Sequence, residues 1–196
     1  TVLLFYQDYM YTGKTDLLEK YYDVLKTRIL MDLERKDGLI SSKSDKLTGE
    51  FKMELGFSKP DTRVRDIVDW PAGQKDTGWK LANKEGERDG YEMVAINTVV
   101  NSFYFHNLVL MKKIAESLGK TEDVLFFKQK AEQVKEVINN KLFDKSRGVY
   151  VDGEGSSHAS LHANMFPLAF DIVPDKYKKS VTEFIKTRGM ACSVYG

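Results

Sequence analysis

The sequence predicts an all-α protein built from helical hairpins, with long loops and at most short strands. Apolar residues recur at helical spacing in several separate segments. Two similar stretches, Gly13–Asp16 and Gly119–Glu122, each lie between two such segments. Repeated αα-hairpins form either an open solenoid or a closed α/α toroid, and this repeat is far longer than that of common solenoids. We therefore expect part of a toroid whose long loops build a pocket.

The first hairpin is predicted between Thr1 and about Asp37. An apolar pattern opens the chain at Thr1, and a second helix begins after Thr15, which is a suitable N-cap. The apolar face of this second helix has residues three or four positions apart: Leu18, Tyr22, Leu25, Ile29 and Leu33. Residues 36–90 follow without helical periodicity, and we expect long loops there, which are commonly functional in a compact domain.

The second hairpin is predicted from residue 97 to residue 142. Asn97–Leu118 has a helical apolar face and is followed by Gly119, a favourable residue after a helix end. The next helix starts at Thr121 with an apolar stripe: Val124, Phe127, Ala131, Val134, Ile138 and Leu142. A turn and a short strand at 149–151 are expected after it.

A third pair of helices is predicted near the end of the sequence. Leu161–Phe170 has helical character, and Pro167 within it indicates a kink or an early stop. A further helix is expected from Pro174 to about Lys186, before Arg188 and Gly189 end it.

Composition excludes several classes of protein. The 196 residues contain 30 Lys and Arg against 29 Asp and Glu, so charge gives no reason to expect nucleic acid or an anionic membrane as a partner. A single cysteine, Cys192, excludes an internal disulfide framework and a Cys-based zinc site. No apolar run approaches the length of a membrane span. Because both ends lie within apolar patterns, we expect residues 1–196 to be a single partial domain.

The sharpest local feature is the pair Asp69 and Trp70, followed by Pro71. An indole face can pack on the apolar face of a pyranose while a neighbouring carboxylate accepts hydrogen bonds from its hydroxyls. This pair is therefore a candidate sugar-binding site. The alternative is structural, with Trp70 as a buried loop anchor and Asp69 as a helix cap.

Two further clusters contain candidate site residues. Glu87 and Asp89 lie in a Gly-flanked acidic loop, and paired carboxylates perform glycoside hydrolysis, although such a loop is also typical of a solvated surface. His158 and His162 are four residues apart, but no other Cys or His cluster completes a metal site. We expect no metal and no cofactor; one histidine binds a ligand hydroxyl or has a structural role.

Five stretches follow one another through nearly the whole chain. They are 66–71, 87–91 leading into 97–104, 114–120, 158–168 and 188–196. In this order they resemble the catalytic domain of bacterial α-L-rhamnosidases, glycoside hydrolase family 78. The resemblance implies an (α/α)6 toroid and an inverting mechanism, in which one Glu is the general acid and a second Glu is the base that activates water.

The resemblance also implies where the catalytic residues lie. The acid belongs to a motif upstream of a region like Tyr9–Gly13, and the base lies downstream of a region like Ser193–Gly196. Neither motif is in this sequence, so we expect a middle portion of the domain, with the catalytic Glu pair outside it and the isolated segment inactive or nearly so. Its implied contribution is substrate binding by these residues: Asp69, Trp70, Glu87, Asp89, His158 and His162.

Other readings stay open at this point. The chain could belong to another toroid glycosidase of the mannosidase, trehalase or glucoamylase type, or to a non-enzymatic helical-repeat binding scaffold. The expected partner is a carbohydrate substrate, and the resemblance favours a periplasmic or secreted location over a cytoplasmic one. A partial toroid leaves apolar helix faces uncovered, so we expect exposed apolar patches or a homo-oligomer that covers them.

Overall fold

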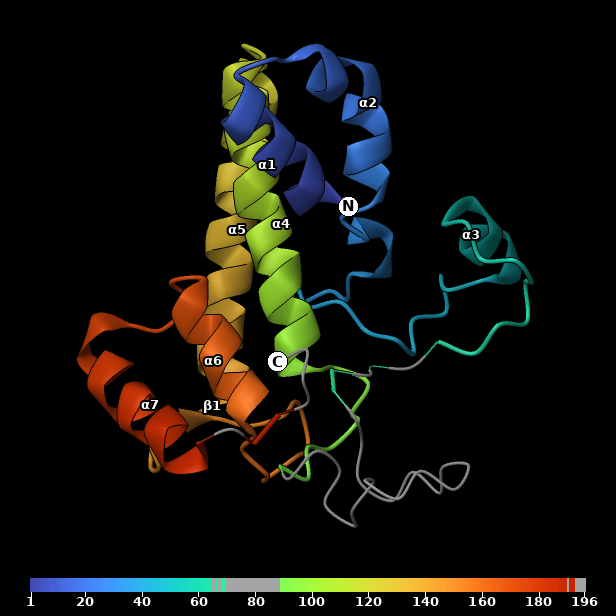
Figure 1. Ribbon diagram of the computed structural model, residues 1–196. Coiled ribbons are helices and arrows are strands. Elements are labelled where there is room, and N and C mark those ends of the chain that lie inside the picture. Colours follow the sequence, from blue (N-terminus) through green and yellow to red (C-terminus); the bar gives the residue numbers. More distant parts are fainter. Residues whose placement is uncertain (65, 67, 70–88, 190, 193–196) are drawn as a thin grey trace.

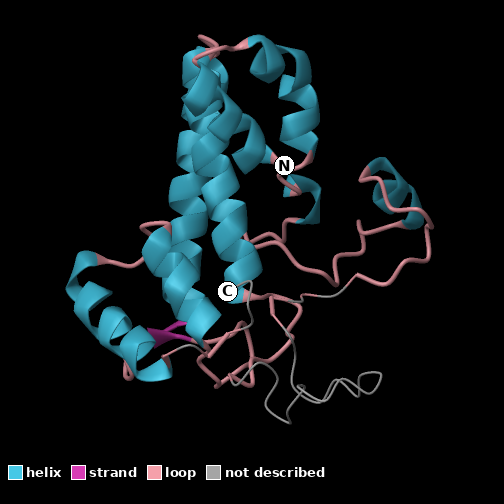
Figure 2. Ribbon diagram, viewed as in Figure 1, coloured by secondary structure: helices cyan, strands magenta, loops and turns pink. Residues whose placement is uncertain are grey.

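A computed structural model describes residues 1–64, 66, 68–69, 89–189 and 191–192 of the chain. In these residues the protein is mostly helical, with one small antiparallel pair of strands (Figures 1 and 2). Its elements are α1 (Val2–Thr12), α2 (Asp16–Thr27), α3 (Gly49–Glu54), α4 (Thr98–Ser117), α5 (Thr121–Lys141), β1 (Phe143–Asp144), β2 (Val149–Tyr150), α6 (Leu161–Ala169) and α7 (Asp175–Arg188). The predicted all-α class and the predicted hairpins are confirmed.

The two similar stretches of sequence make equivalent turns. Gly13 ends α1 with φ 68°, and Gly119 follows α4 with φ 67°. This left-handed conformation suits glycine, because it has no Cβ to clash with the backbone. The chain therefore reverses into α2 in one case and into α5 in the other. The two hairpins also touch, since α1 and α2 both contact α4.

Two elements differ from the expectations. The apolar face from Leu18 to Leu33 is buried as predicted, but the α-helix ends at Thr27 and a 3-10 turn covers Met31–Leu33. Leu30 has φ 68°, which is incompatible with a continuing right-handed helix. The short helix α3 lies in the predicted loop region, where the Thr48 side chain caps it by accepting the Phe51 N–H.

The second hairpin forms the centre of the apolar core. Residues of α4 and α5 that face each other are almost completely inaccessible to solvent, among them Leu108, Met111, Phe127 and Ile138. The polar side of α5 is bonded to α2 and to the chain that follows it. Tyr22 donates a 2.7 Å hydrogen bond to Asp123, and Lys130 binds Glu34 at 2.7 Å. These bonds therefore connect the first hairpin and the turn after it to α5.

Two buried asparagines each bind the first turn of a helix to a residue that precedes that helix in the sequence. In the first turn of α4, the Asn101 amide accepts the Ile40 N–H at 2.8 Å and donates to the Ile40 carbonyl at 3.2 Å. In the first turn of α6, Asn164 makes the same two bonds to Tyr150, at 2.8 and 3.0 Å. Each asparagine also donates to the carbonyl of the residue that caps its own helix. We call this arrangement the amide clip.

Large apolar side chains are also exposed in the described part of the chain. The most exposed are Leu4, Met10 and Tyr11 of α1, with exposed fractions of 73%, 60% and 88%. Exposed apolar side chains are thus present on α1, and both a continuous apolar patch and the homo-oligomer that would cover it stay predictions. Among the described residues, no helix combines the length and the apolar character needed to span a bilayer.

Candidate functional site

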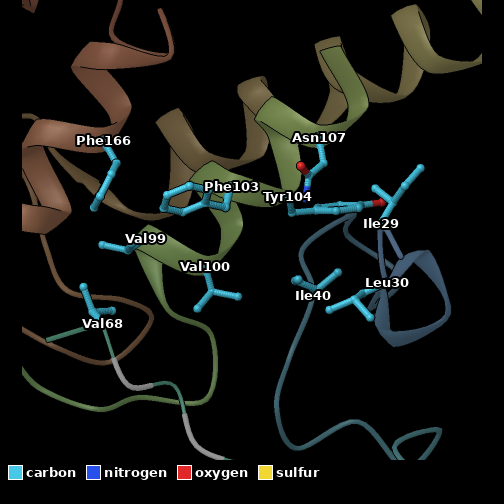
Figure 3. A pocket seen from close by; sticks show the side chains of 10 residues that line it. All are labelled: Ile29, Leu30, Ile40, Val68, Val99, Val100, Phe103, Tyr104, Asn107 and Phe166. Atoms are coloured by element: carbon cyan, nitrogen blue, oxygen red, sulfur yellow. The ribbon is translucent and has the colours of Figure 1, made fainter. Parts of the chain in front are cut away.

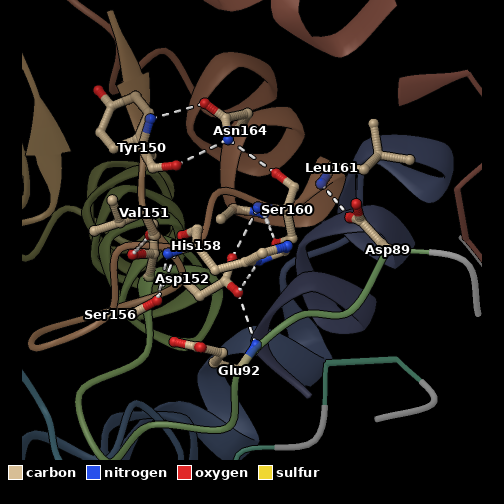
Figure 4. Close-up of polar contacts among 12 residues, drawn as sticks. Asp89, Glu92, Tyr150, Val151, Asp152, Ser156, His158, Ser160, Leu161 and Asn164 are labelled. Carbon is tan, nitrogen blue, oxygen red and sulfur yellow. Dashed lines mark hydrogen bonds and ion pairs between the residues drawn. The ribbon is translucent and has the colours of Figure 1, made fainter. Parts of the chain in front are cut away.

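Three aspartates bind residues 158–162, where the chain enters α6. The first is Asp152, which lies two residues after the end of β2 and is 2% exposed. Its carboxylate accepts the N–H groups of Glu92 at 2.7 Å and Ser160 at 2.9 Å, and it lies 2.7 Å from Nδ1 of His158 (Figure 4). Asp152 thereby fixes the orientation of the His158 imidazole, which is 32% exposed.

The second aspartate is Asp89, which is 6% exposed. One of its oxygens accepts the N–H of Leu161, the first residue of α6, as Figure 4 shows. The other accepts a 2.9 Å hydrogen bond from Nε of Arg188, at the end of α7. The negative charge lies at the positive end of the α6 dipole. Asp89 therefore connects the start of α6 to the end of α7.

The third aspartate is Asp69, a candidate sugar ligand. Its Oδ2 lies 3.3 Å from Nε2 of His162, and the two side chains are 8% and 4% exposed. The backbone of the same loop is held by Tyr91, whose hydroxyl accepts the Val68 N–H at 3.0 Å and donates to the Asp69 carbonyl at 2.5 Å. Burial raises the pKa of Tyr91, so its hydroxyl stays protonated and can donate.

An apolar pocket of about 350 Å³ is lined by neighbours of this pair. Val68, next to Asp69, lines it together with Phe166, whose ring centre is 6.1 Å from that of His162. Figure 3 shows Phe103 and Tyr104 of α4 on the wall of the pocket. The ring centres of Phe103 and Phe166 are 4.7 Å apart. The remaining lining residues are Ile29, Leu30, Ile40, Val99, Val100 and Asn107. Aromatic and aliphatic walls of this kind suit the apolar face of a ligand.

The structure brings four of the six predicted site residues to one place. Asp69, Asp89, His158 and His162 all contact or belong to the segment that opens α6. Trp70 and Glu87 lie outside the described residues. In the described part of the chain, no group of three or more His, Cys, Asp or Glu side chains could hold a metal ion.

Two residues that organise this candidate site carry no strong signal in the sequence. Asp152 binds both backbone segments, and Tyr91 holds the Asp69 loop. The sequence offers one weak signal for Asp152, an aspartate between a short apolar strand and Gly153. Its partner Glu92 is 60 positions away in sequence, so no local pattern could have predicted that bond.

Comparisons with known proteins decide the family. The family model described as the bacterial alpha-L-rhamnosidase 6 hairpin glycosidase domain matches residues 1–195. The chain belongs to this family. A comparison with curated proteins found no match.

Solved rhamnosidase structures share the fold. The GH78 family rhamnosidase of Bacillus sp. GL1 is 17% identical with a TM-score of 0.67, and the comparison covers 97% of this chain and 17% of that one. The α-L-rhamnosidase from Dictyoglumus thermophilum is 16% identical with a TM-score of 0.57, covering 91% of this chain and 16% of that one. The chain thus spans about a sixth of each structure's length, and its helical hairpins are part of a six-hairpin rhamnosidase domain.

Proposed function

We propose that this chain is the substrate-binding part of an α-L-rhamnosidase, which releases terminal α-L-rhamnose from oligosaccharides or glycosides. Membership of the rhamnosidase domain family supports the reaction class. The single observation that carries the assignment of the site is the buried Asp69–His162 pair beside an apolar pocket. A carboxylate next to an apolar wall provides the two kinds of contact that a sugar ring requires.

The proposed contacts divide between the loop and the start of α6. Asp69 and Trp70 bind the sugar, the first by hydrogen bonds and the second by stacking. His158 lies at the rim: Asp152 holds its Nδ1, and Nε2 has no hydrogen-bond partner in the described part of the chain. A hydroxyl can bind there. Glu87 and Asp89 complete the rim, Asp89 through its hold on α6.

The apolar pocket favours rhamnose over other hexoses. L-Rhamnose carries a methyl group where mannose and glucose carry a hydroxymethyl group. A pocket lined by Val68, Val99, Phe103 and Phe166 gains free energy from burying a methyl group and gives a hydroxyl no partner from these four side chains.

The proposed mechanism is inverting. One Glu protonates the glycosidic oxygen while a second Glu takes a proton from the attacking water, and the two carboxyl groups stand roughly 6.5–9.5 Å apart to admit that water. Both glutamates lie outside these 196 residues in this proposal. The described residues bind and orient the sugar between them.

The test measures hydrolysis of 4-nitrophenyl α-L-rhamnopyranoside by the full-length protein. Asp69→Asn should lower kcat/KM by roughly a hundredfold, because it removes charged hydrogen bonds to the sugar. Asp23→Asn on the exposed side of α2 is the matched control and should leave kcat/KM unchanged. NMR of the product should show the β-anomer first, as inversion requires.

Three outcomes would contradict the proposal. Faster hydrolysis of the mannoside or glucoside would favour another toroid glycosidase, and no hydrolysis of any glycoside would favour a binding scaffold. Turnover by the isolated residues 1–196 would place the acid and base inside the chain.

A further inference from the structure

Two segments of the chain are joined to each other beside Asp69: residues 89–92, and residues 152–162, which lead into α6 and include its first two residues. Asp89, on the first segment, accepts the backbone N–H of Leu161. Asp152, on the second segment, accepts the backbone N–H groups of Glu92 and Ser160. Each segment therefore supplies a buried carboxylate to a backbone N–H of the other, and the connection holds in both directions.

Each joined segment presents one side chain to the Asp69 loop. Tyr91 bonds to both ends of the Val68–Asp69 unit through its hydroxyl, at 3.0 and 2.5 Å. His162 places Nε2 3.3 Å from the Asp69 carboxylate. Tyr91 and His162 are 5% and 3% exposed, so neither has water as a ready substitute partner. The backbone and the carboxylate of Asp69 are thus held by different residues.

The geometry of the pair assigns the donor of its hydrogen bond. Within the described residues, the buried Nδ1 of His162 has no hydrogen-bond partner. Nε2 faces the Asp69 carboxylate, which can only accept, so Nε2 is the atom that donates.

We propose that Tyr91 and His162 are positioning residues that hold the Asp69 carboxylate in its sugar-binding orientation. Asp152 and Asp89 fix the two segments that carry them. His162 acts through Asp69 and does not itself touch the sugar. This inference rests on the proposed function, because it assigns a purpose to the Asp69 contact.

The test is a pair of double-mutant cycles in the full-length protein, with the same aryl rhamnoside. Tyr91→Phe and His162→Leu should each raise KM roughly tenfold with a smaller change in kcat, because a misplaced carboxylate weakens sugar binding. In an Asp69→Asn background, neither substitution should have a further effect on KM. His162→Gln, which retains an N–H donor, should recover most of the affinity.

Tyr22→Phe is the matched control for Tyr91→Phe. It also removes one buried phenol hydroxyl, but from α2, far from α6 in Figure 1. It should lower the unfolding temperature and leave KM unchanged.

The outcomes distinguish failure of the Asp69 sugar contact from failure of the positioning role. If Asp69→Asn leaves KM unchanged, the sugar contact fails, and the positioning role fails with it. If Asp69→Asn raises KM but Tyr91→Phe or His162→Leu raises it further in that background, the contact stands and the positioning role is overturned. If His162→Leu does not fold, the comparison of His162→Gln with Tyr91→Phe decides in the same way.

Discussion

The protein contains the same structural unit twice, with very different loops. In both copies a helical hairpin turns at a left-handed glycine, a second turn follows at Gly38 or Gly148, and an amide clip binds the residue two positions later. In the second copy only residues 151–160 separate the clipped Tyr150 from the next helix. In the first copy residues 41–97 lie between Ile40 and α4.

This difference distinguishes the helical frame from the candidate site. In each copy the amide clip ties the first turn of a helix to the residue two positions after the turn glycine, whatever length of chain lies between them. By sequence, the long connection of the first copy includes Asp69, Trp70, Glu87 and Asp89, and the short connection of the second includes His158. The frame therefore accommodates connections of very different lengths, since the entropy cost of a longer connection grows slowly.

The largest expected effect concerns the frame alone. Phe127→Ala in α5 should lower the free energy of unfolding by about 3–5 kcal/mol, because it leaves a cavity in a fully buried site. Its neighbour Phe126 is 45% exposed, so Phe126→Ala should cost less than about 1 kcal/mol. Urea unfolding measures both. A changed KM in folded Phe127→Ala would contradict the separation of frame and site.

Substitution of the two clips tests whether the copies are equivalent. Asn101→Leu and Asn164→Leu should each cost about 2–4 kcal/mol, because each leaves a buried N–H and a buried carbonyl without partners. Asn164→Leu should also raise KM, since α6 carries His162, whereas Asn101→Leu should change it less. Similar stability losses by urea unfolding would confirm equivalence, and a loss in only one variant would refute it.

A smaller effect concerns the charges that join the two copies. Arg35 binds Asp37 of the first copy and Glu154 of the second, and lowers the pKa of both carboxyl groups. A lowered folded-state pKa stabilises the protein above the ordinary carboxyl range, and that stability is lost as pH falls through the folded pKa values. The Arg35 ion pairs are partly exposed, so together they stabilise the folded state by no more than about 1 kcal/mol.

The measurement is urea unfolding at several pH values. Wild type should lose more stability than Arg35→Gln as the pH falls from about 5 toward 2. Lys112→Gln, which breaks an ion pair within α4 alone, is the control and should show the wild-type slope. If the free energy of unfolding falls with pH in parallel for wild type and Arg35→Gln, these charges do not couple the two copies.

The smallest effect on stability concerns the exposed face of α1. Leu4→Ser and Tyr11→Ser should change the free energy of unfolding by less than about 0.5 kcal/mol. If this face mediates a homo-oligomer, light scattering of residues 1–196 should show a lower mass for both variants. A monomeric wild type would refute the predicted homo-oligomer.

The helical hairpins are encoded locally in the amino-acid sequence. Apolar spacing and glycine position are local signals, and they located α4, α5, α6 and α7 and the apolar face of α2. They did not locate the end of α2, because the left-handed Leu30 depends on packing around it. They also did not locate α3, a short helix begun by one cap.

The assembly of the candidate site depends on contacts between segments that are far apart in the sequence. Asp89 binds an N–H 72 positions away in sequence, and Asp152 binds one 60 positions away. Composition and loop character could nominate Asp69, Asp89, His158 and His162, but nothing local indicated Asp152 or Tyr91. The physical reason is that buried carboxylates need donors, and the folded backbone supplies them from wherever the chain happens to pass.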